Sequence, residues 1–228
     1  MEGFYLNSVD SSTAKPSVIG IFTSPIVQFQ RIKDTPLVVI PLFILIAISL
    51  IASGLIAYIP DYSAVIQMTL EQGLDTSNEF AEAMEVFTRL IVFISGLFVP
   101  VFISLLPAFI FWVVGKVLGS MVSFKQLFSM MLYVSLIVAL GSLFNSIVVV
   151  LFNLDPMTVV TGVSMLFDPL DPLAPLLSFF DIFNIWYIIL TALGLGYVAG
   201  FNKGAAWSLP IVLSLITAFI AYLTSGIQ

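Results

Sequence analysis

The chain has 228 residues, of which 60% are hydrophobic and 9% are charged, with a net charge of −6 and neither cysteine nor histidine. A soluble domain has roughly 45–50% apolar and about 25% charged residues, so a soluble or a disordered protein is excluded. The negative charge argues against a nucleic-acid partner. The missing histidine and cysteine remove the commonest general base, thiolate chemistry and the commonest metal ligands, and we expect no cofactor and no metal.

A short helix is predicted within the N-terminal segment, residues 1–36. Ser24 followed by Pro25 is typical of a helix start, because serine caps free N–H groups and proline fits the first turn. Pro36 ends the pattern. We expect an amphipathic helix that lies on the cytoplasmic leaflet, and an ordinary linker is the alternative. The residues expected at this interface are Pro25, Phe29, Arg31 and Lys33.

Five apolar runs follow, each long enough to cross about 30 Å of hydrocarbon, which takes about 20 helical residues. They cover about 37–59, 90–114, 127–152, 176–200 and 205–227. The runs are continuous and show no alternation, so helices are expected and a membrane β-barrel is not. We therefore predict an all-α polytopic membrane protein, in which residues 37–228 form a bundle of five transmembrane helices.

The basic residues predict how this bundle is oriented. Of the seven lysines and arginines, only Arg89 lies in the loops after the first or third run. The others lie before the first run, between the second and third, or between the fourth and fifth. The positive-inside rule therefore predicts a cytoplasmic N-terminus and a C-terminus outside.

The loop between the first two runs, residues 60–89, is strongly acidic. Thr76 and Glu79 have the spacing of a capping box, which predicts a helix that begins there and continues into the second run. We interpret this helix as a solvated surface element, and the alternative is a docking surface for an extracytoplasmic partner or a cationic peptide.

Asp181 is the one acid inside a predicted span, and an ionisable group at membrane depth is a candidate functional residue. It lies about one turn inside the fourth run, where a helix N-terminus stabilises a carboxylate, so a structural role is the competing interpretation. A proton or cation site would need partners, and Asn184 and Asn145 are the candidates.

Small residues at four-residue spacing occur in two of the runs, and such residues let helix backbones approach closely. They are Ser49, Ser53 and Ala57 in the first run, and Ala192, Gly196 and Gly200 in the fourth. The spacing predicts close packing, either within the bundle or at a dimer interface.

Two sequence motifs resemble those of the Yip-domain family of five-span membrane proteins. TSPIVQFQRIKDTP, residues 23–36, followed by LVVIP, resembles the family's motif before the first span. FFDIFNIWYIILTALGLGYVAG, residues 179–200, resembles its fourth-span signature. The matching residues are Thr23, Ser24, Pro25, Phe29, Arg31, Ile32, Pro36 and Pro41 in the first motif, and Asp181, Ile182, Phe183, Trp186, Leu190, Gly194, Leu195 and Gly200 in the second.

The resemblance implies a polytopic scaffold that is not an enzyme. Eukaryotic members bind Rab-type GTPases, usually through a long cytoplasmic N-terminus, whereas the short segment here resembles the prokaryotic type. Some bacterial members resemble accessory subunits of ABC exporters in antimicrobial-peptide resistance. We therefore expect a multi-pass protein of a prokaryotic cytoplasmic membrane, whose partners are lipid and other membrane proteins, an ABC exporter among them, or itself.

Two other functions stay open from the sequence. A small transporter or permease would place Asp181 near its transport path. An intramembrane enzyme such as a lipid hydrolase ranks below it, because without histidine or cysteine it would need a centre built on aspartate or serine.

Overall fold

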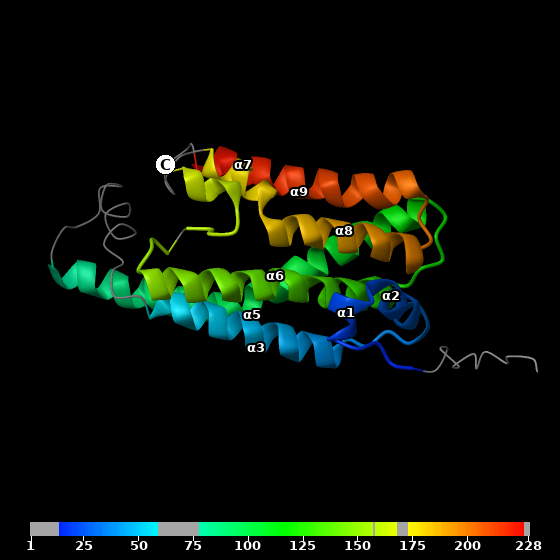
Figure 1. Cartoon of the computed structure of the whole chain (residues 1–228), viewed down its shortest axis with the longest axis horizontal. Coiled ribbons are helices and arrows are strands. Elements are labelled where there is room, and N and C mark those ends of the chain that lie inside the picture. The colour runs from blue at the N-terminus through cyan, green and yellow to red at the C-terminus, as the bar shows by residue number, and fades with distance from the viewer. Residues whose placement is uncertain (1–13, 59–77, 157, 168–172, 226–228) are drawn as a thin grey trace, which may run out of the picture.

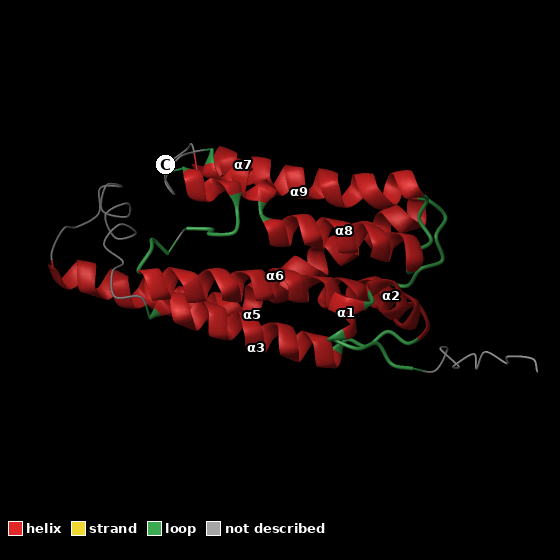
Figure 2. Ribbon diagram, in the orientation of Figure 1, coloured by secondary structure: helices red, strands yellow, loops and turns green. Residues whose placement is uncertain are grey.

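The computed structural model describes residues 14–58, 78–156, 158–167 and 173–225. Within these ranges the chain forms helices joined by loops, and no strand occurs (Figure 2). The apolar helices are α3 (Val39–Ala57), α5 (Asn78–Val117), α6 (Phe124–Phe152), α8 (Ile182–Tyr197) and α9 (Lys203–Ser225). All but α8 are long and apolar enough to cross a membrane. The predicted all-α membrane fold is confirmed, while its orientation in the membrane stays a prediction.

Helix α6 lies at the centre of the bundle. It packs against α3 and α5 on one side and against α8 on the other, and α9 covers the far side of α8 (Figure 1). The helix begins with a capping box, in which Ser123 accepts a hydrogen bond from the Gln126 N–H at 3.3 Å and the Gln126 Oε1 accepts one from the Ser123 N–H at 2.8 Å. This cap places the helix start slightly before the predicted residue 127, because hydrophobicity alone does not register a polar first turn.

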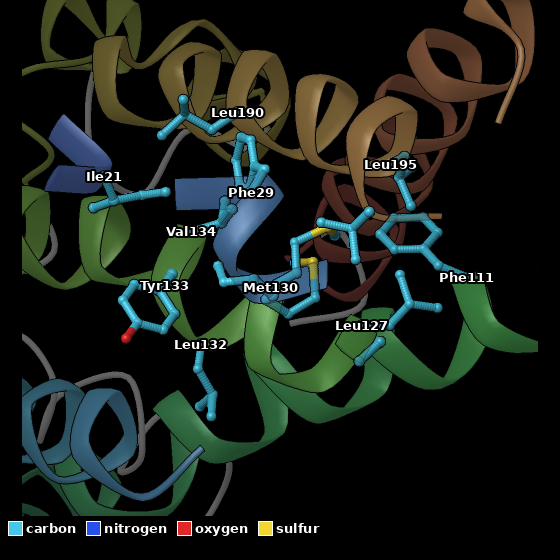
Figure 3. Packing of buried hydrophobic residues seen from close by; sticks show 14 of the residues in the cluster. Ile21, Phe29, Phe111, Leu127, Met130, Leu132, Tyr133, Val134, Leu190 and Leu195 are labelled. Carbon is cyan, nitrogen blue, oxygen red and sulfur yellow. The ribbon is translucent and has the colours of Figure 1, made fainter. Parts of the chain in front are cut away.

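The tightest part of the core surrounds the first half of α6. Met130 and Tyr133 of α6 are fully buried there against Phe29, Leu190 and Leu195 from other helices (Figure 3). Close packing of this kind resists any change in side-chain volume. The core therefore fixes α6, α8 and the N-terminal segment relative to one another.

The N-terminal segment forms two short helices, α1 (Gly20–Thr23) and α2 (Pro25–Asp34). Helix α2 begins at Pro25, as predicted, but the Ser24 hydroxyl makes no capping hydrogen bond and instead donates to the Gly20 carbonyl at 3.4 Å. Ser24 is the N-cap residue, as predicted, but the capping hydrogen bond expected of its side chain is absent. The reason lies in Gln28, whose side chain donates to the Ser24 hydroxyl and accepts from the Ser17 N–H at 2.7 Å, which ties the two helices together.

The apolar face of α2 packs against protein. Phe29 and Ile32 are fully buried, and α2 contacts α6 and α8. Upstream, the Tyr133 hydroxyl donates to the Pro16 carbonyl at 3.0 Å. Tyr133 lies about 15 Å along α6 from its start, at 1.5 Å per residue, so the segment before α1 reaches well into the bundle. Whether α2 also touches the cytoplasmic leaflet stays a prediction.

The fourth predicted span has a later start than expected. Residues 174–180 form two single turns, α7 (Ala174–Leu177) and the 3₁₀ turn η2 (Ser178–Phe180), and the continuous helix α8 begins only at Ile182. A helix of 16 residues extends about 24 Å, which is shorter than about 30 Å of hydrocarbon. Hydropathy alone did not predict this break, because the run from 176 is apolar on both sides of Asp181. In the structure Asp181 follows the two turns and is the N-cap of α8. A further 3₁₀ turn, η1 (Val163–Leu166), lies upstream of this break.

Helix α5 is the longest element. Its 40 residues extend about 60 Å, twice the hydrocarbon thickness, and its first turns project beyond the neighbouring helices (Figure 1). The prediction that the acidic helix continues into the second span is confirmed from Asn78 onward. Thr76, the expected cap, lies outside the described residues.

Candidate functional site

Asp181 is the N-cap of α8. One carboxylate oxygen accepts hydrogen bonds from the Phe183 and Asn184 N–H groups, each at 2.9 Å. The other accepts a hydrogen bond from the Thr161 hydroxyl. Two backbone N–H groups that would otherwise lack a partner at the helix start are thus satisfied. Asp181 therefore has the structural role that the sequence left open, at the N-terminus of a helix.

Thr161 joins Asp181 to α6. The Asn145 side chain donates to the Thr161 hydroxyl at 2.9 Å and accepts from the Thr161 N–H at 3.2 Å. Asn145 was expected near Asp181 from the sequence, and the structure places it there through Thr161 as the intermediate. Sequence reasoning missed Thr161, because it lies in an irregular loop without any periodicity that would place it.

Asn184 and Trp186 make separate contacts. The Asn184 amide donates to the Phe179 carbonyl at 2.8 Å, which holds the turn before α8. Trp186 lies edge-to-face against Phe22 of α1, with the ring centroids 6.0 Å apart. Trp186 therefore helps to hold the N-terminal segment and takes no part in the Asp181 cluster.

One cavity adjoins this cluster, and a second lies next to it. Asp181, Asn145 and Asn184 line a cavity of about 330 Å³ between α6 and the start of α8. A second cavity of about 280 Å³ lies between α3, α5 and α6. No group of three or more acidic side chains able to hold a metal ion occurs in the described part of the chain.

The two candidate packing glycines, Gly196 in α8 and Gly200 just after it, have no close neighbour within the chain. A Cβ atom added at Gly196 or at Gly200 would meet nothing within 4 Å. Gly200 instead has φ of +69°, a left-handed conformation that favours glycine. Close approach at α8 occurs instead at Gly194, next to Met130 and Phe29, and at Gly141 of α6, next to Phe183.

The small residues of the first predicted span do pack closely. A Cβ atom added at Gly96 of α5 would lie 2.8 Å from the Ser49 carbonyl oxygen and would also clash with the Ser53 hydroxyl. The Ser53 hydroxyl donates to the Phe93 carbonyl at 3.3 Å. The expectation of close packing along this face of α3 is confirmed, with α5 as the neighbour.

The expected interfacial residues of α2 have different environments. Pro25 occupies the first turn and Phe29 is buried. Arg31 is partly buried and its Nε has no hydrogen-bond partner among the described residues. Lys33 is exposed, and its carbonyl accepts a hydrogen bond from the Gln126 amide at 2.6 Å.

Arg89 connects the projecting part of α5 to α3. Its guanidinium donates to the Ala57 carbonyl at 2.7 Å and forms an ion pair with Glu85 at 2.6 Å. The guanidinium thereby satisfies a carbonyl at the C-terminal end of α3. Near this contact, Val86 and Phe87 expose 67% and 54% of their surfaces. Acidic and apolar side chains therefore share residues 82–89, which we call the outer part of α5 because it lies at the projecting end of the helix.

The family model described as the Yip1 domain matches residues 19–225. The chain belongs to the Yip1 domain family. It is also 36% identical over 209 residues to Membrane protein YknW of Bacillus subtilis (strain 168), covering 89% of this chain and 87% of the relative. No solved structure matches.

The positions of the two sequence motifs in the fold agree with this family assignment. The match includes both α2 and α8, which carry the two resembling motifs, and these two helices pack against each other in the core. The resemblance stated from the sequence is thus confirmed, as is the prokaryotic type, since the relative is bacterial. The chain is a multi-pass membrane protein of this family.

Proposed function

We propose that this protein is a non-enzymatic subunit of the prokaryotic cytoplasmic membrane, which works by binding another membrane protein. An ABC-type exporter is the class of partner that the family resemblance favours. The observation that carries the proposal is the outer part of α5, residues 82–89, which projects beyond the bundle and exposes apolar side chains beside carboxylates. Exposed apolar side chains that lie beside charged ones on a projecting helix are typical of a binding surface.

The polar groups of the bundle support a scaffold over an enzyme. Asp181 caps α8, Asn145 binds Thr161, and the Tyr133 hydroxyl binds the Pro16 carbonyl. Each of these contacts fastens one segment to another. A catalytic centre would instead place a nucleophile beside a base and an orienting group.

Affinity purification from native membranes in mild detergent tests the proposal. We expect a stoichiometric membrane partner with the wild-type chain, and much weaker recovery with Phe87→Ala, which removes an exposed ring from the outer part of α5. Phe98→Ala is the matched control, because Phe98 is 53% exposed on the same helix but lies eleven residues further along it, within the apolar run of about residues 90–114. A strict monomer at native expression, with no partner, would contradict the proposal.

A small permease is the second candidate, and one observation favours it: Asp181 lines a cavity of about 330 Å³. In that case Asp181→Asn abolishes transport while the protein still inserts and folds, because asparagine also caps helices well. Unchanged flux in this variant removes Asp181 from the transport path.

A further inference from the structure

The two cavities beside α6 adjoin each other. The cavity between α3, α5 and α6 and the cavity beside Asp181 share four lining residues, Ile56, Val138, Ser142 and Ser146. Together they follow one face of α6, because their α6 lining residues recur every three or four positions. These residues are Ser135, Val138, Ala139, Gly141, Ser142, Asn145, Ser146 and Val149. At 1.5 Å per residue this face extends about 21 Å, some two-thirds of the hydrocarbon thickness.

Serines from three helices line the cavity between α3, α5 and α6. Their side chains are small, so they leave space between the helices, and they are polar, so that space is not an ordinary apolar void. They are Ser49 and Ser53 of α3, Ser95 of α5, and Ser135, Ser142 and Ser146 of α6.

Ser146 places a polar side chain where the two cavities meet, since it is only 4% exposed and lines both of them. A hydroxyl that faces only apolar atoms costs free energy. A water molecule in the crevice can bind such a hydroxyl and so removes this cost.

The two ends of the crevice differ. Toward the start of α6, the Ser104 and Ser135 hydroxyls are joined by a hydrogen bond of 2.9 Å, and the fully buried residues Met131 and Tyr133 lie beyond. At the other end the crevice reaches Asp181, which is the one carboxylate in the lining of either cavity. Access is therefore expected at the Asp181 end, where the negative charge favours cations.

We infer that this crevice is filled with water from the Asp181 end as far as Ser135, and that it admits small polar solutes, cations in preference to anions. Each cavity, at about 280 and 330 Å³, has room for several water molecules, since one water occupies about 30 Å³ of liquid. The inference does not depend on the partner protein of the proposed function.

Thiol labelling tests the inference on the whole protein in its membrane. The chain has no cysteine, so single-cysteine variants need no altered background. Ser142→Cys and Ser146→Cys place a thiol in the crevice. Ile147→Cys is the matched control, because Ile147 is next to Ser146, is 41% exposed and lies outside the lining of both cavities.

The reagent is the membrane-impermeant cation trimethylammonium-ethyl methanethiosulfonate, applied to sealed vesicles of each orientation. Methanethiosulfonates react with the thiolate, which forms in water and is suppressed in lipid, so we expect both crevice thiols to react at least about tenfold faster than the control. Equal slow reaction at all three positions would overturn the inference, and it is the result expected if an acyl chain fills the crevice. Neither labelling result changes whether a partner protein is recovered by affinity purification. The inference about the crevice and the proposed function are therefore tested separately.

The charge of the reagent tests the role of Asp181. We expect the cationic reagent to react faster than its sulfonatoethyl analogue at Ser142→Cys, and Asp181→Asn to lower this ratio by about threefold, as expected for one charge seen through water over several ångströms. Glu82→Gln, on the outer part of α5 and outside both linings, is the control that leaves the ratio unchanged. An unchanged ratio in Asp181→Asn would overturn the cation preference.

Discussion

Gly141 of α6 and Gly196 of α8 both lie inside apolar helices, but the structure gives opposite expectations for alanine at the two positions. A Cβ atom at Gly141 would lie 2.5 Å from Cγ and 2.8 Å from Cβ of Phe183. The Phe183 Cβ is fixed to the backbone of α8, so the clash cannot be relieved by rotating a side chain. A Cβ atom at Gly196 would meet nothing within 4 Å.

The magnitudes follow from two opposing terms. Alanine improves helix propensity by about 1 kcal/mol over glycine, whereas an overpacked contact costs about 1–3 kcal/mol. We therefore expect Gly141→Ala to lower the free energy of unfolding by about 1 kcal/mol and Gly196→Ala to raise it by about 0.5–1 kcal/mol. For a chain of this size the two variants should differ in Tm by about 4–8 °C.

Thermal unfolding in detergent micelles, followed by tryptophan fluorescence and size exclusion, measures this difference. Equal stabilisation by the two substitutions would refute the close contact between α6 and α8 at Gly141. Gly196→Ala also tests a second point, because the four-residue spacing of small residues predicts that Gly196 packs against another helix. If that face binds another subunit, the variant is stable in detergent yet loses its partner in the membrane.

Three further changes test other contacts. Gln28→Ala removes the side chain that ties α1 to α2 and should speed hydrogen–deuterium exchange at residues 17–24, whereas Gln30→Ala, at an exposed position, should not. Asp181→Ala should lower the free energy of unfolding by about 1 kcal/mol through loss of the α8 cap, and Asp181→Asn by much less; equal losses would contradict the cap. Ser123→Ala should cost about 1 kcal/mol in the same thermal assay, because it removes the capping box of α6, and an unchanged Tm would argue against that box.

The parts of the fold that depend on local signals could be predicted from the sequence. Hydrophobic runs predict helices wherever backbone groups must be satisfied in lipid, and the runs near α3, α6 and α9 differ from the observed helices by a few residues. The start of α2 at Pro25 was also predictable, because proline there restricts the chain locally. The fourth run was harder, because Asp181 caps a helix inside a stretch that hydrophobicity treats as continuous.

The contacts between distant segments could not be predicted. The approach of Pro16 to Tyr133 depends on how α1 and α2 fit between other helices, and Thr161 meets Asp181 only because a loop folds back over α6. Glycine spacing was an incomplete guide for the same reason. It indicated Gly196, whereas the position that packs against Met130 is Gly194, since spacing does not show which side of a helix meets its neighbour.

The central claim, that the outer part of α5 binds another membrane protein, is tested most directly by photo-cross-linking in living cells. A benzophenone amino acid is placed at Phe87 or, as the control, at Phe98, eleven residues further along α5. We expect Phe87 to yield one covalent adduct with a defined exporter subunit, and the control to yield none with that subunit. Adducts with lipid alone at both positions would contradict it.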